Sequence, residues 1–436
     1  MRISYAAVIG PTLLLLSFVV GQNQRRIGTR HDVSLELHLQ MGSNLGSFSS
    51  GENFPDLSPV GLVQSDKGFI GTGTLISPTI VVTAGHVLRG SYKAKAPVAS
   101  EWTFSLGSDS LKSTETCSVS EVILHPGWTA RLSYESGVGD GDVLGLDLAL
   151  LRLKLPVTGV TPARFNTVDS EIIGSRVILA GYGSIADGKR GVTSVDNFDR
   201  LAGENTLDRV VETVNTSNVP QAYKGGLLGV DFDSPDEFSN SLGSQASLID
   251  YLGSGSSAST PLPYEATTAE GDSGGPAFVR MNDVWKVVGT VSYGTESSVY
   301  GDVTVYTRLA SQAGWLKKNL ERWAPARRTG FGEWLNLDWL GNFATYQGGW
   351  AFHEKLGWFY SPDNKSDEFS PKNEADEFWA WQTGIGWWWT SIKAYPYFYF
   401  YDHDRSRWLY FSASDSTPSS CRFYDYEIKD WRIFEY

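Results

Sequence analysis

Short apolar runs alternate with polar clusters through most of the first three quarters of the chain. Between Gly61 and Leu309 the intervening clusters are rich in Gly, Ser, Asn and Asp, which are residues that favour turns. Representative apolar runs are TIVV at 79–82, RVILA at 176–180, VVGTV at 287–291 and VTVY at 303–306. Many short strands separated by turn signals are typical of a barrel or sandwich. We therefore predict an all-β fold for this region.

The pattern changes near the end of this region. Apolar residues at Trp315, Leu316, Leu320 and Trp323 recur at helical spacing, so a helix is predicted over residues 311–323. The following segment APARRTG, residues 324–330, breaks that spacing and is expected to be a linker.

Residues 331–436 have a different composition, because they hold 11 of the 16 tryptophans. A loose motif recurs as GWAF at 349–352, GWFY at 357–360, FWAW at 378–381 and GWWW at 386–389. Successive β-hairpins that present aromatic residues explain a period of roughly 20 to 30 residues. These aromatics either form the core of a small β-rich repeat domain or, for a subset, a surface that binds carbohydrate or the cell envelope.

A chain of 436 residues suggests two or three domains, because one core seldom grows beyond about 250 to 300 residues. We assign residues 45–323 to the main domain, 331–436 to the aromatic repeat domain, and 22–44 to a looser, propeptide-like segment. The net charge of −13 argues against nucleic acid or an anionic membrane surface as a partner.

The first residues are typical of an export signal. Arg2 precedes a largely apolar run over residues 3–20, and Val19 and Gly21 permit cleavage before Gln22. A membrane anchor is the alternative, but a Gly-Pro pair within the run and the lack of a basic flank favour a cleaved signal over residues 1–21. We expect a secreted, periplasmic or cell-surface protein.

Three segments carry residues suited to nucleophilic catalysis. Ser273 lies in EGDSGGPA at 270–277, His86 closes an apolar strand in VVTAGHV at 81–87, and Asp147 lies in GLDLALLRL at 145–153. A serine hydroxyl needs a base such as His86 to accept its proton, and Asp147 would orient that imidazole. The glycines permit a tight turn that aims the amides of Gly271 and Ser273 at a developing oxyanion.

The order His, Asp, Ser in these contexts resembles the chymotrypsin/trypsin family of serine endopeptidases. The resemblance implies two six-stranded antiparallel β-barrels and a C-terminal helix, with the active site between the barrels. His86 and Asp147 would come from the first barrel and Ser273 from the second. It implies peptide or protein substrates, peptide-bond hydrolysis through an acyl-enzyme, and no cofactor or metal.

The resemblance also places the substrate-binding residues. Thr267 aligns with the base of the primary specificity pocket, where trypsin-like members carry an aspartate. The segment Ser292-Tyr293-Gly294 aligns with the strand that pairs with substrate backbone. Gly294 would leave one pocket wall open and Thr304 would narrow the other. A small or medium neutral substrate side chain is therefore expected.

Only Cys117 and Cys421 are present, and Val87 and Gly71 stand where animal relatives place a disulfide. This departure, together with RHDV at 30–33, resembles a disulfide-poor bacterial branch of the family. The sequence leaves open whether the two cysteines pair. Asp231, Asp233 and Asp236 have calcium-ligand chemistry, but a flexible acidic loop is the preferred interpretation.

Two further hypotheses follow from the resemblance. Relatives activated by cleavage pair a new amino terminus with the aspartate before the nucleophile, here Asp272. Arg25 and Arg26, before Ile27, offer a cleavage point, although the usual IVGG start is absent. The alternative function is a binding protein whose protease fold has lost activity and which works through its aromatic tail. The intact catalytic residues argue against that alternative.

Overall fold

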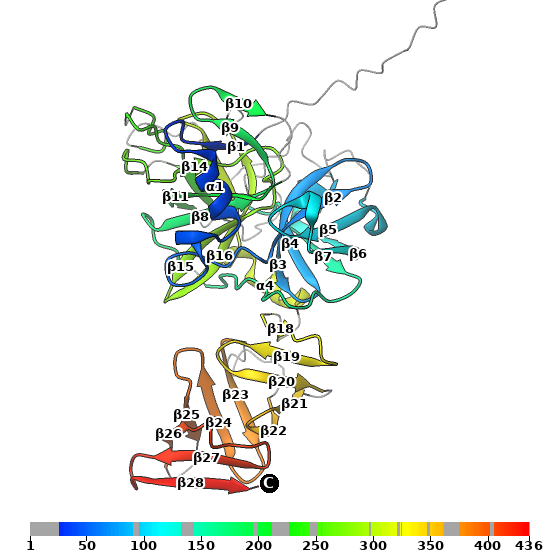
Figure 1. Ribbon diagram of the computed structural model, residues 1–436, viewed down its shortest axis with the longest axis vertical. Coiled ribbons are helices and arrows are strands. Elements are labelled where there is room, and N and C mark those ends of the chain that lie inside the picture. The colour runs from blue at the N-terminus through cyan, green and yellow to red at the C-terminus, as the bar shows by residue number, and fades with distance from the viewer. Residues whose placement is uncertain are drawn as a thin grey trace, which may run out of the picture.

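The computed structural model describes residues 26–89, 96–131, 144–168, 170–194, 199–211, 226–236, 238–243, 252–253, 255–295, 298–320, 323, 325–346, 349–361, 375–401 and 405–435. The predicted signal at residues 1–21 lies outside these ranges. Two β-rich units lie side by side, and a third sheet built from the C-terminal residues lies beyond them along the long axis (Figure 1).

The first unit is a closed barrel with strand order β2-β3-β4-β7-β6-β5. Fully buried Val63, Leu75, Val81, Phe104 and Leu151 fill its interior. The strands are β2 (Val60–Ser65), β3 (Ile70–Ser77), β4 (Ile80–Thr83), β5 (Trp102–Leu106), β6 (Glu115–Leu124) and β7 (Ala149–Leu153). The predicted all-β class and a six-stranded barrel are confirmed.

The second unit is a seven-stranded antiparallel sheet with strand order β11-β8-β15-β16-β17-β13-β12. Its strands are β8 (Arg176–Gly181), β11 (Leu201–Thr206), β12 (Arg209–Val211), β13 (Leu227–Asp231), β15 (Pro276–Met281), β16 (Val284–Gly294) and β17 (Val303–Arg308). Among the described residues this sheet is an open half-barrel with one strand more than predicted.

A smaller four-stranded sheet, ordered β10-β9-β1-β14, caps the second unit. It consists of β1 (Arg26–Thr29), β9 (Ser184–Asp187), β10 (Gly191–Ser194) and β14 (Ala266–Thr267). The helix α1 (Leu35–Gly42) follows β1 and packs on β11. The segment interpreted as propeptide-like is therefore built into the fold from Arg26 onward.

The remaining helices are short. They are α2 (Gly85–Arg89), α3 (Pro126–Arg131) and α4 (Ala313–Asn319), with 3-10 turns η1 (Gly46–Phe48), η2 (Ala99–Glu101), η3 (Ser110–Lys112) and η5 (Ala310–Gln312). The predicted terminal helix is present as α4 but ends earlier, because Leu320 has an extended backbone.

The C-terminal region is one antiparallel sheet in which eleven strands follow each other in chain order from β18 to β28. The strands are β18 (Arg327–Arg328), β19 (Trp334–Leu337), β20 (Gly341–Thr345), β21 (Trp350–His353), β22 (Gly357–Tyr360), β23 (Glu377–Gln382), β24 (Gly386–Ser391), β25 (Tyr397–Tyr401), β26 (Arg407–Phe411), β27 (Ser420–Asp425) and β28 (Asp430–Glu435). The expected series of β-hairpins is present.

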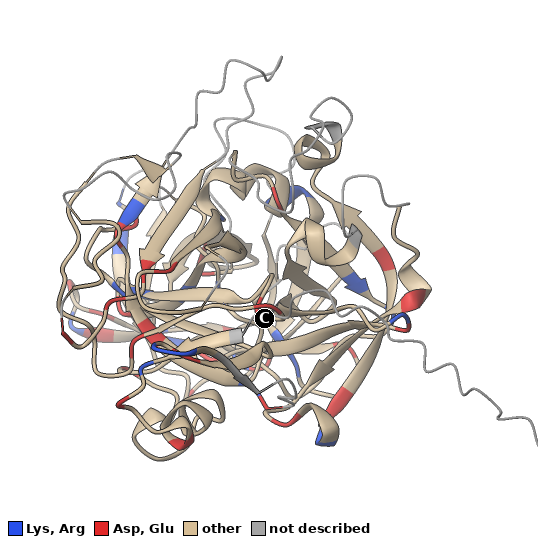
Figure 2. Ribbon diagram, turned by 90° about the horizontal axis from the view of Figure 1, so that it is seen from above, with Lys and Arg blue, Asp and Glu red and all other residues tan. Residues whose placement is uncertain are grey.

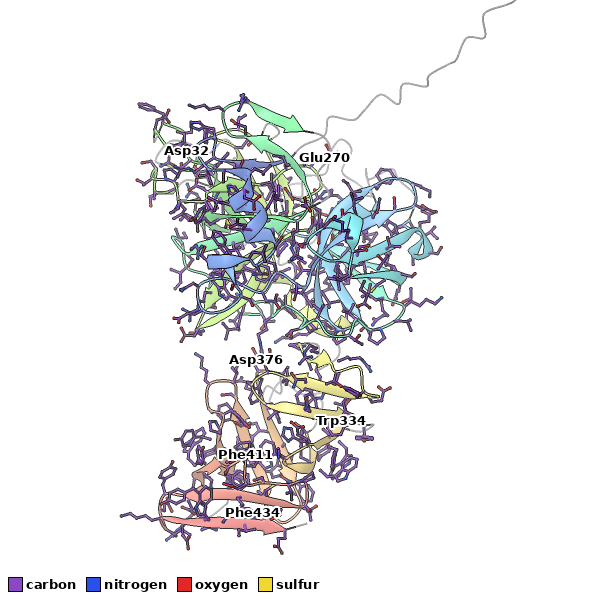
Figure 3. All side chains as sticks on the ribbon, in the orientation of Figure 1. Asp32, Glu270, Trp334, Asp376, Phe411 and Phe434 are labelled. Carbon is purple, nitrogen blue, oxygen red and sulfur yellow. The ribbon has the colours of Figure 1, made fainter. Side chains whose placement is uncertain are left out.

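Buried and partly buried side chains alternate along these strands, and this alternation explains the high aromatic content. In β23, for example, Phe378 and Ala380 are fully buried, whereas Trp379 and Trp381 are only partly buried. Alternate residues point to opposite faces of a strand, so one face of the sheet forms a core and the other is half-exposed. The core face carries the buried aromatics Phe343, Phe359, Phe378, Trp388, Phe398, Phe411 and Phe423, of which Phe411 is labelled in Figure 3.

The junction between the second unit and the C-terminal sheet is packed. Trp323 contacts the rings of Phe343 and Phe378, and Ala326 is fully buried in the same cluster. Arg164 forms an ion pair with Asp376, which lies at the end of the C-terminal sheet nearest the other units (Figure 3). The predicted linker thus contributes to the core of the C-terminal sheet.

Neither cysteine forms a disulfide, and both are buried, Cys117 in β6 and Cys421 in β27. Acidic and basic residues are distributed around the molecule rather than gathered on one side (Figure 2). Asp231 and Asp233 are buried, in contrast to the flexible acidic loop that we expected, and only Asp236 is exposed. In the described part of the chain no group of three His, Cys, Asp or Glu side chains is arranged to hold a metal ion, and no helix could cross a membrane.

Candidate active site

A buried carboxylate lies at the boundary between the first two units. The Asp147 side chain is fully buried, just before β7. Its Oδ1 accepts the backbone N–H of His86 at 2.9 Å, and its Oδ2 lies 2.7 Å from His86 Nδ1. The same Oδ2 accepts the Ser292 hydroxyl at 2.7 Å. Burial removes the hydration of this carboxylate, and three hydrogen-bond donors replace it.

His86 is held in place by its backbone as well as by its ring. It follows β4 directly, in the first turn of α2, and its side chain is 11 % exposed. Because Nδ1 faces Asp147, Nε2 lies on the side of the imidazole ring that points away from this carboxylate. The sequence segments that contribute His86 and Asp147 lie side by side because β4 pairs with β7.

The loop that carries Ser273 packs on the same end of β4. Gly274 has a φ of +80°, and a Cβ there would lie 2.1 Å from Thr83 Oγ1 and 2.8 Å from the amide of Ala84. The Ser273 carbonyl accepts the Thr72 N–H at 2.8 Å. This close approach brings the serine loop against the residues that immediately precede His86. No hydrogen bond between the Ser273 hydroxyl and the His86 ring is present among the described residues.

The backbone amides of the serine loop divide into two sets. Those of Asp272, Gly274 and Gly275 donate to the carbonyls of Ala269, Val291 and Asp272. Within the described chain, the amides of Gly271 and Ser273 donate to no protein acceptor. Gly271 has a φ of +93°, a conformation that favours glycine. Two neighbouring amides are thus left available for an external oxygen atom.

Asp272, which precedes the serine, points away into the second unit. Its carboxylate accepts the N–H groups of Gly183 at 2.8 Å and Ala269 at 2.9 Å. Burial nevertheless raises the pKa of Asp272 to about 8. The predicted pairing with a freed amino terminus stays a prediction.

The residues aligned with the specificity pocket form a cluster of hydroxyls. Thr267 in β14 and Thr304 in β17 are each 1 % exposed, with their Oγ1 atoms 3.0 Å apart. Thr268 Oγ1 lies 2.9 Å from Thr304 Oγ1. No side chain in this cluster is charged, as the sequence indicated. Gly294 has no room for a side chain, because a Cβ there would lie 2.6 Å from a backbone carbonyl.

Ser292 and Tyr293 lie in β16, the strand predicted to meet substrate backbone. Tyr293 is partly buried. The contact between Ser292 and Asp147 was not foreseen from the sequence, and neither was the donation from Thr307 Oγ1 to the Asp147 carbonyl at 3.0 Å. Both link the first unit to strands of the second unit that lie far away in sequence.

The family model described as Trypsin matches residues 53–219 and 250–316, which together exceed half of the chain. The chain belongs to the trypsin family. The match includes all three triad candidates and ends before the C-terminal sheet, so the family accounts for the first two units only.

Curated relatives in the trypsin family include the Vitamin K-dependent protein C of Rattus norvegicus and of Mus musculus. Each is 26% identical over 272 residues, which is 58% of this chain and 47% of the relative. The Transmembrane protease serine 11E of Mus musculus is 26% identical over 254 residues, 56% of this chain and 48% of that protein. The chain thus spans about half the length of these relatives.

Proposed function

We propose that this trypsin-family chain is a serine endopeptidase that hydrolyses peptide bonds with Ser273 as nucleophile, His86 as base and Asp147 as the residue that orients the base. The observation that carries the proposal is the set of three donors to the buried Asp147 carboxylate, one of which is the His86 ring. A carboxylate in this position fixes the tautomer of the imidazole and stabilises its protonated form.

The chemistry would proceed in two stages. Ser273 Oγ attacks the peptide carbonyl while its proton passes to His86 Nε2, and the amides of Gly271 and Ser273 donate to the oxyanion. Collapse of this intermediate breaks the C–N bond, and His86 returns the proton to the leaving amine. A water molecule then repeats the attack on the acyl-enzyme, with His86 again as base.

The substrate preference would follow from the hydroxyl cluster. Thr267 and Thr304 offer no charge to pair with arginine or lysine, so a small or medium neutral side chain before the scissile bond is favoured. Ser292, Tyr293 and Gly294 would pair with the substrate backbone in extended conformation.

We also propose that the protein acts outside the cytoplasm, as a disulfide-poor protease of bacterial type. The export-like segment at residues 1–21 and the lack of a disulfide between Cys117 and Cys421 support this proposal. Amino-terminal sequencing of the protein recovered from a culture supernatant or periplasm tests it: removal of the signal alone gives a start at Gln22, and further cleavage after Arg26 gives a start at Ile27.

Labelling by a fluorophosphonate probe tests the catalytic assignment. The wild-type chain should be labelled and should cleave peptides, whereas Ser273→Ala should do neither while keeping its melting temperature. Ser49→Ala removes an exposed hydroxyl elsewhere and should behave as wild type. Peptide hydrolysis near the wild-type rate in clean Ser273→Ala protein would refute the triad and favour a different nucleophile.

A second role for the C-terminal sheet follows from its half-exposed side, the outward aromatic face. Cross-strand pairs place its rings side by side across the sheet, including Trp350 with Tyr360 and Trp389 with Tyr399. The face comprises Trp334, Trp350, Phe352, Trp358, Tyr360, Trp379, Trp381, Trp387, Trp389, Tyr397, Tyr399, Tyr401, Trp408, Tyr410, Tyr424 and Trp431.

We propose that this face binds a neutral polysaccharide of the cell envelope. Trp358 and Trp408 are nearly half exposed, at 49% and 47%, and a contiguous apolar patch of this kind usually marks a binding surface. Flat aromatic rings can stack on the C–H faces of sugar rings, while the indole N–H can donate to hydroxyl groups. The aromatics of the opposite face serve the core, so the core interpretation accounts for one face and this binding proposal concerns the other.

Retention on an insoluble neutral polysaccharide and on envelope fractions tests this role. Trp358→Ala combined with Trp408→Ala should lower retention several-fold and leave peptide hydrolysis unchanged. The control Phe331→Ala removes an aromatic that is 80% exposed in the turn between β18 and β19. Equal retention of both variants and the wild type would argue that the face has another occupant.

A further inference from the structure

The strand that precedes both β units lies at the centre of the cap sheet. β1 runs parallel to β9 and antiparallel to β14, and Ile27 within it is fully buried. The paired residues include Gly28 with Thr267. A segment near the start of the chain therefore forms a ladder with the residues that carry the proposed specificity pocket.

The contact at Gly28 is unusually close. A Cβ at this position would lie 2.7 Å from Thr267 Cγ2 and 2.6 Å from the Ser298 carbonyl oxygen. Both distances are shorter than van der Waals contact, so only glycine lets β1 lie this near to β14. Thr267 in turn contacts Thr304, so the position of β1 determines how far this hydroxyl pair can move outward.

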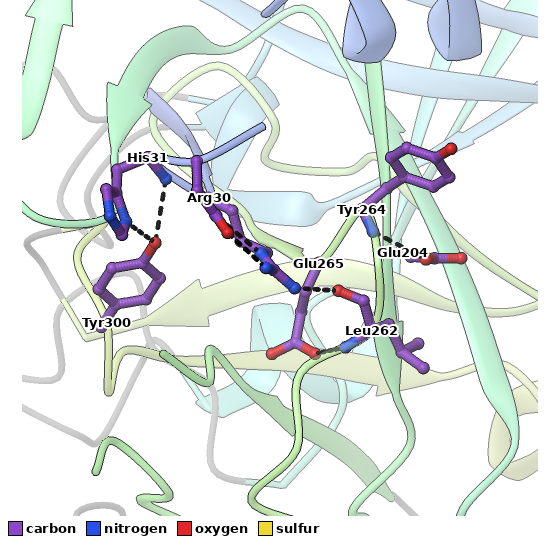
Figure 4. A network of polar contacts seen from close by, with 8 residues as sticks. Arg30, His31, Glu204, Leu262, Tyr264, Glu265 and Tyr300 are labelled. Atoms are coloured by element: carbon purple, nitrogen blue, oxygen red, sulfur yellow. Dashed lines mark hydrogen bonds and ion pairs between the residues drawn. The ribbon is translucent and has the colours of Figure 1, made fainter. Parts of the chain in front are cut away.

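The last residue of β1 and the two residues that follow it attach the strand to β9 and to two loops, and Figure 4 shows the contacts of Arg30 and His31. Thr29 Oγ1 donates to the Ala186 carbonyl at 3.2 Å, and Arg30 Nη1 donates to the Leu262 carbonyl at 2.9 Å. The Tyr300 hydroxyl accepts the backbone N–H of His31 at 3.0 Å and lies 2.7 Å from the His31 ring nitrogen Nδ1.

The Tyr300 side chain is itself anchored, because its ring centroid lies 4.8 Å from that of the fully buried Phe232. The Arg30 guanidinium is oriented by an ion pair with Asp32 at 2.7 Å. Protein contacts alone therefore hold the Arg30 and Tyr300 side chains in place, without any contribution from substrate. The attachment joins residues that lie between 157 and 269 positions apart in sequence.

We propose that β1, through Gly28 and the His31–Tyr300 contact, is a built-in positioning element that sets the depth of the primary specificity pocket and so selects the substrate side chain. The inference rests on the proposed endopeptidase function, because Thr267 matters to specificity only if the chain cleaves peptides. No residue of β1 touches the catalytic groups, so its role is to hold the pocket wall in place.

A substitution at residue 28 should change kcat/KM for substrates with large side chains more than for substrates with glycine. We expect an added methyl group at residue 28 to push Thr267 away from β1, as well as the Ser298 carbonyl, and a shift of Thr267 toward the proposed pocket would disfavour larger substrate side chains. A misfit of one methyl group in such a pocket changes kcat/KM by about tenfold or more. Substrates with glycine before the scissile bond do not enter the pocket and should be nearly unaffected.

The experiment compares Gly28→Ala with the control Gly51→Ala in the full chain. Gly51 is an exposed glycine whose Cβ would meet nothing within 4 Å. For matched peptides with valine or glycine before the scissile bond, Gly28→Ala should lower the valine-to-glycine ratio of kcat/KM about tenfold, mainly through KM. The rate of fluorophosphonate labelling should stay close to wild type, because the probe carries no such side chain.

Tyr300→Phe provides a second test that does not alter the backbone. It removes only the hydroxyl group that contacts His31 and should shift the same ratio in the same direction by a smaller factor. An unchanged ratio in both folded variants would overturn the inference, and if Gly28→Ala does not fold, an unchanged ratio in Tyr300→Phe alone overturns it. Failure of the wild-type chain to be labelled or to cleave either peptide would instead refute the proposed function.

Discussion

The substitution Gly274→Ala tests whether close packing of the serine loop on β4 positions the nucleophile. Its φ of +80° is costly for any residue with a Cβ, by about 1–2 kcal/mol. The new methyl group would also lie 2.1 Å from Thr83 Oγ1 and 2.4 Å from the Thr72 carbonyl. Overpacking of this kind typically costs a further 1–3 kcal/mol or so. The total loss of unfolding free energy should be about 2–5 kcal/mol.

The effect on rate should exceed what the stability loss alone explains. The loop can relieve the clash only by moving away from the residues before His86, and Ser273 must move with it. A displacement near 1 Å from the reactive geometry lowers kcat by about a hundredfold. Peptide hydrolysis should be measured well below the melting temperature of the variant, so that all of the protein is folded.

Gly174→Ala provides the matched control. Gly174 has a φ of +86° and open space around its Cβ position, and it precedes β8 at the end remote from the serine loop. It should lose about 1–2 kcal/mol of stability with unchanged kcat/KM. If folded Gly274→Ala has the same kcat/KM as Gly174→Ala, the packing of the loop on β4 does not position Ser273, and this reasoning is wrong.

Two further predictions concern buried carboxylates. Ser292→Ala removes one of the three donors to Asp147, so kcat/KM should fall about tenfold, the equivalent of one hydrogen bond to a charged group; a value within twofold of wild type would contradict this. Burial, with the nearby charge of Asp231 as a smaller cause, raises the pKa of Asp208 to about 9. The folded chain then keeps a proton that the unfolded chain loses near pH 4, so this contribution to stability is present in acid and lost as the pH rises to 9. Thermal unfolding from pH 5 to 9 should show a falling midpoint, and Asp208→Asn should flatten that dependence.

The residues proposed for catalysis were accessible from the sequence because each lies in a short motif with local backbone requirements. A glycine-framed serine and a histidine at a strand end are visible without knowledge of the fold. The connections between these motifs were not visible, because Ser292 and Asp147 are joined only by the packing of the second unit on the first. Such contacts depend on strand order, which composition and spacing do not encode.

The strand β1 was missed for a related reason. It has four residues and a single fully buried apolar side chain, Ile27, so no alternating pattern marks it as a strand. Its partners in β9 and β14 lie far along the chain. The end of the terminal helix was misplaced because Trp323 occupies a helical spacing but packs against the C-terminal sheet instead. In both cases tertiary contacts, rather than the local periodicity of apolar residues, determine the secondary structure.

The open edge of the C-terminal sheet affects how the protein behaves at high concentration. An exposed outer strand offers unpaired backbone groups to a second copy, and aromatic side chains beside it would favour such stacking. The outer strand β28 carries Asp430, Arg432 and Glu435 within six residues. A second copy brought edge to edge would have to bury these charges, which is costly without matched partners. Within the described part of the chain, the charges on β28 therefore oppose fibre-like growth at that edge of the sheet, while the opposite edge strand β18 has only two residues, one of which forms a bridge with Thr158.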